Sequence, residues 1–80
     1  MAEASVGDIK RYHESGEVYS VEVLNVQEKP YGNAMGEEYS LKLLEVIDST
    51  MGHPPKSGLE FTVWKSIEPG SYGGWHLLDE

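Results

Sequence analysis

The chain has 80 residues, and its 14 acidic and 6 basic side chains give a formal net charge of −8 with histidine neutral. This length predicts a single domain, residues 1–80, with a small core, and the absence of cysteine excludes disulfides, thiolate metal sites and a cysteine nucleophile. The chain has no apolar run of membrane-spanning length and no signal-peptide stretch in its first 20 residues, so we expect a soluble cytoplasmic protein.

The N-terminal segment carries no decisive pattern. Residues 1–5 are expected to be frayed, as chain ends commonly are. Val6, Ile9 and Tyr12 fit either one helical turn or an edge strand, so both alternatives stay open for residues 6–12.

Two segments 20 residues apart echo each other. Residues 19–26 read YSVEVLNV and residues 39–46 read YSLKLLEV. Apolar residues alternate at the start of each copy, which predicts two strands with one buried face. The apolar phase then changes at Leu24 and at Leu44, which indicates a bulge or a stretch buried on both sides. Good helix formers in the second copy leave a helix as its alternative.

Alternation at Leu59, Phe61 and Val63 predicts a third strand, and a short fourth follows near the C-terminus. Glycine and proline in the three connecting segments predict long loops, which are common places for binding. The predicted strands lie near residues 17–26, 37–47, 59–66 and 75–78, and the predicted loops cover residues 27–36, 48–57 and 68–74.

The order of these segments suggests a fold family. The second strand runs into LEVIDST (residues 44–50), and the third follows as GLEFTVWK (residues 58–65). With the bulged first strand, this layout over residues 17–66 resembles the first three strands of replication-factor-type OB-fold domains. The resemblance implies a five-stranded barrel that binds single-stranded nucleic acid. The expected fold is all-β, a small curled sheet or five-stranded barrel, OB-like with SH3-like as the alternative, because the chain has no room for the helix that OB folds often carry.

No residue pattern indicates catalysis. His13, His53 and His76 are far apart and lack metal-ligand spacing, and no serine lies in a nucleophile motif. The paired carboxylates fit a solvated surface better than an acid–base pair in a cleft. We therefore expect no enzyme, no metal site and no cofactor.

Aromatic residues give the best candidates for binding. Trp64 shares its phase with Glu60 and Thr62 on the polar side of the third strand, where it would serve as a stacking platform or a partner anchor, or else cover the barrel end. Tyrosines in glycine-containing loops are expected to be exposed, and nearby lysines to complete a basic, aromatic patch. The candidate binding residues are Trp64, Lys65, Lys42, Tyr31 and Tyr72.

The charge bears on the choice of partner. Phosphate contacts by lysine and arginine supply most non-specific affinity for nucleic acid, and this chain has few of them among many acids. We expect a non-enzymatic interaction module that binds a protein partner or a second copy of itself, with the strand at residues 59–66 as an inviting edge. A single-stranded nucleic-acid-binding protein and an acidic mimic of nucleic acid remain the alternatives.

Overall fold

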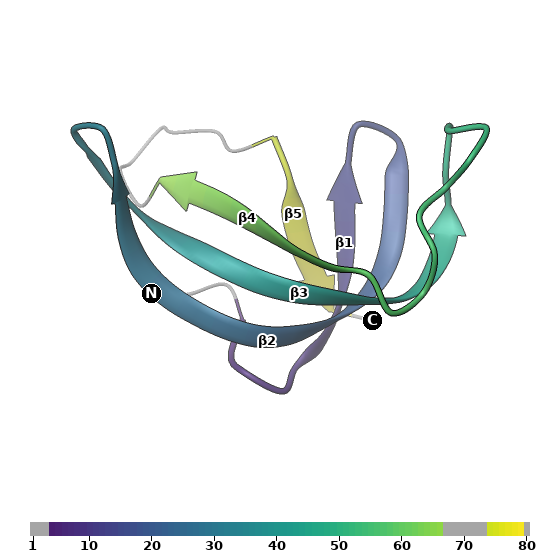
Figure 1. Ribbon diagram of the computed structural model, residues 1–80, viewed down its shortest axis with the longest axis horizontal. Helices are drawn as coiled ribbons and strands as arrows, with labels where there is room; N and C mark the ends of the chain where they lie inside the picture. The colour runs from purple at the N-terminus through teal and green to yellow at the C-terminus, as the bar shows by residue number, and fades with distance from the viewer. Residues whose placement is uncertain (1–3, 67–73, 80) are drawn as a thin grey trace.

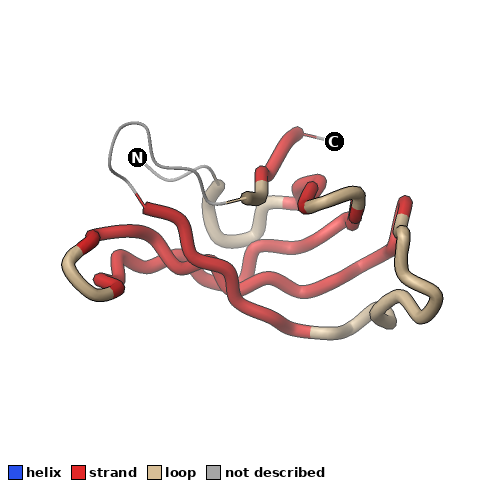
Figure 2. The backbone as a smooth tube through the Cα atoms, turned by 90° about the horizontal axis from the view of Figure 1, so that it is seen from above, coloured by secondary structure: helices blue, strands red, loops and turns tan. Residues whose placement is uncertain are grey.

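The computed structural model describes residues 4–66 and 74–79. These residues form five β-strands and no helix, connected by turns and loops (Figure 2). The strands build one sheet in the order β4-β3-β2-β1-β5, and every neighbouring pair is antiparallel (Figure 1). The predicted all-β class is therefore confirmed. The strands are β1 (Ile9–Glu14), β2 (Glu17–Tyr31), β3 (Ala34–Asp48), β4 (Glu60–Ser66) and β5 (His76–Asp79).

The sheet is curled but not closed. In Figure 1, β2 and β3 curve beneath the other strands and rise at both ends. Among the described strands, β4 pairs only with β3, and β5 pairs only with β1. Tyr12 of β1 and Phe61 of β4 meet edge to face across the open side, with ring centroids 5.5 Å apart. Side-chain contacts therefore bridge the gap that a closed barrel would fill with backbone hydrogen bonds.

The inner side of the curl holds the core. The echo segments supply most of it, because their alternating residues all point inward, and β1 and the C-terminal segment add aromatic rings. Val21, Val23, Leu41 and Leu43 have no exposed surface. The remaining buried hydrophobic residues among those described are Ala4, Tyr12, Tyr19, Tyr39, Trp75 and Leu77.

The phase changes in the echo segments are bulges, which is the first of the two expected alternatives, and not stretches buried on both sides. The register between β2 and β3 shifts at Leu24, an extra residue on β2, and at Leu44, an extra residue on β3. Each bulge moves the next apolar residue back to the inner side, so Val26 and Val46 both pack against the core. A third shift lies near the beginning of β2. Bulges of this kind increase local twist and help a small sheet to curl.

The predicted loop over residues 27–36 is wrong. β2 and β3 continue through it as a hairpin arm and end in a two-residue turn, Gly32-Asn33, with a Gly32 φ of 61°. A positive φ at the first turn position alone is the type II′ geometry, which suits glycine there. Pro30 is tolerated because it lies one residue from the turn-flanking pair Tyr31–Ala34, where its nitrogen faces away from β3.

The N-terminal alternative is resolved in favour of a strand. β1 lies inside the sheet between β2 and β5, rather than at an edge. A two-residue turn, Ser15-Gly16, joins β1 to β2 with φ values of 48° and 87°, the type I′ pattern. The second echo segment is also a strand, and the long connection after β3 is present. The predicted loop at residues 68–74 lies almost wholly outside the described residues, which include only Gly74 of it.

Candidate binding site beside the β4 edge

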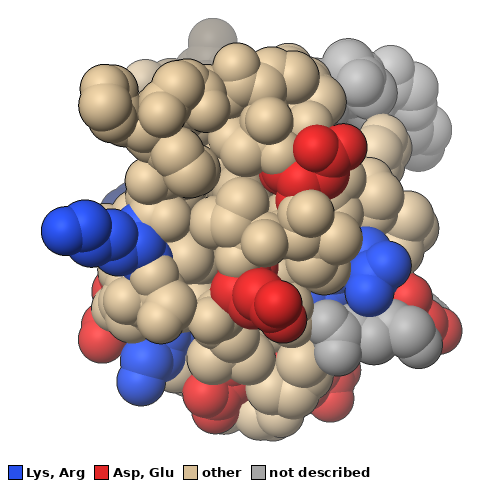
Figure 3. Space-filling view, turned by 90° about the vertical axis from the view of Figure 1, so that its right-hand side faces the viewer, with Lys and Arg blue, Asp and Glu red and all other residues tan. Residues whose placement is uncertain are grey.

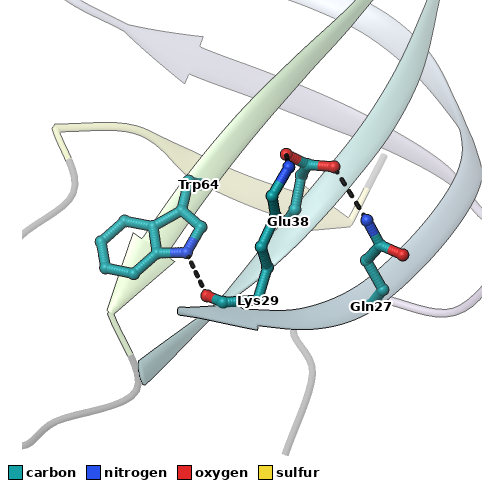
Figure 4. A network of polar contacts seen from close by, with 4 residues as sticks. All are labelled: Gln27, Lys29, Glu38 and Trp64. Carbon is teal, nitrogen blue, oxygen red and sulfur yellow. Dashed lines mark hydrogen bonds and ion pairs between the residues drawn. The ribbon is translucent and has the colours of Figure 1, made fainter. Parts of the chain in front are cut away.

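Trp64 is half-buried and fastens β4 to the hairpin arm. Its indole Nε1 donates a hydrogen bond to the carbonyl oxygen of Lys29 at 2.7 Å (Figure 4). The centroid of its ring lies 5.8 Å from that of the Tyr31 ring. Lys29 in turn forms an ion pair with Glu38 at 3.1 Å, and Gln27 donates to the other oxygen of the same carboxylate at 3.0 Å. The polar edge of the indole is thus used within the fold.

Gly36 makes room for this packing. A Cβ atom on Gly36 would overlap the six-membered ring of Trp64 and would lie 2.5 Å from the carbonyl oxygen of Lys65. The indole therefore rests directly on the backbone of β3. This contact covers one face of the Trp64 ring. Trp64 therefore packs against the outer side of the sheet.

The structure does not assemble the predicted basic, aromatic patch. Lys65 follows Trp64 on β4 and so points to the opposite side, where its Nζ lies 4.5 Å from the ring centroid of Trp75. Lys42 lies in register with Glu60, several residues along the sheet from Trp64. Tyr31 does lie beside Trp64 and is 76% exposed. The last candidate, Tyr72, lies outside the described residues.

A pocket of about 570 Å³ opens on the inner side of the curl, between β1 and β4. Sequence reasoning missed it because it lies between the two strands that frame the unclosed side of the sheet, and strand partners far apart in the chain are not visible in a periodic pattern. One signal was present: Met51 and Pro55 place apolar groups in a loop that follows a strand. Its lining residues are Tyr12, Glu14, Tyr19, Leu43, Met51, His53, Pro55, Leu59, Phe61, Thr62 and Val63.

Two tyrosines form the floor of the pocket. Tyr12 and Tyr19 stack with ring centroids 5.9 Å apart, and both are nearly fully buried. The Tyr12 hydroxyl donates a hydrogen bond to Oε1 of Glu14, and the Tyr19 hydroxyl donates one to Oε1 of Glu17. Burial, with the hydrogen bond to Glu14, raises the pKa of Tyr12, and burial, with the hydrogen bond to Glu17, raises the pKa of Tyr19 to about 12. Both phenols therefore stay neutral hydrogen-bond donors.

Glu17 fixes the position of the β3–β4 connection, which forms one side of the pocket. Its carboxylate accepts hydrogen bonds from the hydroxyl of Ser49, from the N–H of Thr50 at 2.7 Å and from the hydroxyl of Thr50 at 2.8 Å. Led by the Ser49 bond, these contacts lower the pKa of Glu17 from 4.5 to about 2. The connection between β3 and β4, which supplies Met51 to the pocket, is thereby fastened to the turn between β1 and β2.

The outer edge of β4 runs along the mouth of this pocket. Leu43 donates its N–H to the carbonyl oxygen of Leu59 at 2.8 Å, so by the alternation of an antiparallel ladder Phe61 and Val63 also bond to β3. Glu60, Thr62 and Trp64 then turn their N–H and C=O groups outward. The Trp64 carbonyl agrees with this assignment, because it accepts a hydrogen bond from Nε1 of Trp75 at 3.1 Å.

No family model matches the chain, and neither a curated protein nor a solved structure matches it. Among the described residues, no helix is long and apolar enough to span a membrane. Nor does that part of the chain contain a group of three or more histidines and carboxylates that could hold a metal ion.

Proposed function

We propose that this protein is a non-enzymatic interaction module that binds an extended protein strand, from a partner or from a second copy of itself, along the outer edge of β4. The observation that carries the proposal is the position of this edge. β4 is the last strand of the sheet, and Thr62 belongs both to the edge and to the lining of the pocket.

Strand addition uses chemistry that this edge offers. Unpaired N–H and C=O groups of an edge strand bond to an added strand and supply affinity, while pockets beside the edge select side chains. Glu60 and Thr62 present such groups, whereas the outward carbonyl of Trp64 is already bonded to Trp75. The accessible stretch is therefore short, and the pocket would have to supply a large share of the binding free energy.

Two observations weigh against single-stranded nucleic acid as the ligand. Trp64, the expected stacking platform, has one face against Gly36 and its Nε1 bonded to Lys29. The net charge of −8 also opposes the approach of a polyanion. Against the acidic mimic, the acidic residues are scattered along the chain rather than set in rows, so the protein-binding proposal is preferred.

A proline on β4 tests the proposal. Thr62→Pro removes the outward N–H and leaves the ladder to β3 unbroken, because the Thr62 nitrogen does not bond to β3. Thr62→Val is the matched control, since it keeps the N–H and a β-branched side chain. Self-association is measured by sedimentation equilibrium, and partner binding by selecting extended peptides from a random display library against the wild-type protein.

We expect Thr62→Pro to abolish self-association, the binding of selected peptides, or both, and Thr62→Val to retain them. Circular dichroism must show the same strand content in both variants. Peptides that bind Thr62→Pro as tightly as the wild type would contradict the proposal. A strictly monomeric protein that selects no peptide would contradict it as well.

A further inference from the structure

We infer that the pocket between β1 and β4 accepts a lysine or arginine side chain of the bound strand. This inference deepens the proposed function by naming the chemistry of the partner, and it rests on that function for the direction from which the side chain enters. The pocket volume of about 570 Å³ lies within the range of about 300–1,000 Å³ that is usual for sites holding small ligands.

The walls of the pocket suit a long side chain with an apolar stem. Tyr19, Phe61 and Val63 supply aromatic and aliphatic surface, and Met51 and Leu59 add to it at the rim. Lysine and arginine bury their methylene stems along such surface while the charged head stays near a polar group or water. Aromatic faces also attract a cation electrostatically.

One polar group of the pocket lining is a carboxylate, and His53 and Thr62 also belong to this lining. Glu14 lines the pocket, is exposed to solvent, and has its Oε1 held by the Tyr12 hydroxyl. Among the described residues, no cation forms an ion pair with Glu14. A cationic head placed in the pocket would therefore meet a carboxylate that is already oriented, which lowers the entropic cost of pairing with it.

The charge around the pocket favours the same class of ligand. Figure 3 looks at the end of the molecule that carries the β1–β2 turn and the β3–β4 connection. Acidic atoms are exposed in the middle of this face, and the basic groups lie toward its margins. With a net charge of −8 for the chain, the field over this end attracts a basic segment and repels an acidic one.

The register of β4 indicates which side chain of a bound strand would enter the pocket. Side chains that lie opposite each other on neighbouring strands share one face of a sheet. Phe61 and Val63 face inward and line the pocket, whereas the side chain of Trp64, one residue later, lies on the outer side. The basic side chain is therefore expected opposite Phe61 or Val63, and its two neighbours in the bound strand point away from the pocket.

Small probes test the pocket without the edge. N-acetyl-lysine methylamide, N-acetyl-arginine methylamide and the neutral N-acetyl-norleucine methylamide are titrated into ¹⁵N- and ¹³C-labelled protein, and dissociation constants are taken from chemical-shift changes. We expect shifts at Tyr19, Phe61 and Val63, and a two- to fivefold tighter binding of the basic probes, which is about the range that partly exposed ion pairs support.

Glu14→Gln assigns the preference to one carboxylate. This variant keeps an oxygen for the Tyr12 hydroxyl, so the pocket retains its shape, and we expect it to bind all three probes equally. Glu28→Gln is the matched control, because it removes the same charge from the exposed hairpin arm. Equal binding of the neutral and basic probes by the wild type would overturn the inference, as would an equal loss of preference in both variants or shifts confined to other surfaces.

The two proposals fail independently. The small probes are titrated into the wild-type protein and need no backbone pairing, so their preference is measured separately from the effect of Thr62→Pro on peptides. If the probes show the cationic preference and Thr62→Pro still binds selected peptides, the edge proposal is wrong and the pocket stands. If the probes show no preference but Thr62→Pro loses the peptides, the edge stands and the pocket inference is wrong.

Discussion

Single residues hold the β3–β4 connection and the outer side of the sheet in place. Glu17 is nearly buried, yet it carries a charge, because three neighbouring residues donate hydrogen bonds to its two oxygens. Gly36 has the opposite role, since it contributes no side chain and lets Trp64 lie on the backbone. Neither role follows from residue type alone, because a glutamate at a strand start and a glycine near a turn are ordinarily solvent-exposed.

The acid sensitivity of the fold should depend on Glu17. Its pKa is about 2 in the folded chain against 4.5 without these contacts, so protonation favours the unfolded state. The stabilisation is complete above pH 4.5 and is lost as the pH falls toward 2. Thermal melting between pH 7 and pH 2 should show a steeper decrease in the wild type than in Glu17→Gln. Parallel curves for the two proteins would exclude this role.

Gly36→Ala should destabilise the fold by about 1–3 kcal/mol, as overpacked substitutions commonly do. The added methyl group meets the ring of Trp64 and a backbone oxygen that cannot move aside easily. Urea denaturation measures the loss of stability, and the tryptophan emission should shift as the indole is displaced. Gly52→Ala is the control, because a Cβ there meets no atom within 4 Å. Similar denaturation midpoints for the two variants would show that Trp64 does not require the bare backbone.

At the scale of elements, strands with periodic cores are predictable from sequence, and their ends are not. The alternation that ends at Val23 and resumes at Val26 shows the bulge directly, because the apolar phase is a property of the chain itself. The hairpin arm leaves no such trace. Its residues are mostly exposed on both sides, so apolar periodicity is absent, and Pro30 and Gly36 have the composition of a loop.

The candidate site also has some features that the sequence predicts and others that it does not. Tyr31 and Trp64 could be expected to be at least partly accessible, and the structure places them side by side. The separation of Lys65 from Trp64 follows from strand alternation and was open to prediction. The pocket could not be predicted from the sequence, because Tyr12 and Phe61 are 49 positions apart and meet only when the sheet curls. A resemblance to known barrels does not supply that contact, and the OB-like relationship stays a prediction.

At the scale of the whole molecule, charge opposes compaction. Fourteen acids on 80 residues, against six bases, repel one another more strongly in the folded state than in the expanded chain. The ion pairs that the described residues form, such as Lys10 with Asp79, are at the surface and contribute little to stability. Most of the acidic charge therefore stays uncompensated.

Salt should consequently stabilise the protein. Raising NaCl from about 10 mM to about 150 mM shortens the screening length from about 30 Å, which exceeds the shortest extent of the molecule, 20 Å, to about 8 Å, which is well below it. The melting temperature is expected to rise, and KCl should give the same increase because screening does not depend on the cation. A decrease with salt would mean that attractive ion pairs outweigh the repulsion between acids.

In the core segments of β2 and β3, the bulges at Leu24 and Leu44 are positions where the loss of one residue keeps the inward and outward alternation. Elsewhere in a strand, removing one residue exchanges the inward and outward positions of everything beyond it until the pairing slips to compensate. Loss of Leu24 would leave Val26 facing the core and paired with Tyr39, and would instead remove the bulge and the local twist that it adds. The connection between β3 and β4 has no such constraint beyond its attachment to Glu17. Natural variants that differ by insertions or deletions should therefore differ after Met51 or at a bulge, whereas the spacing from Tyr19 to Val23 and from Tyr39 to Leu43 should be constant.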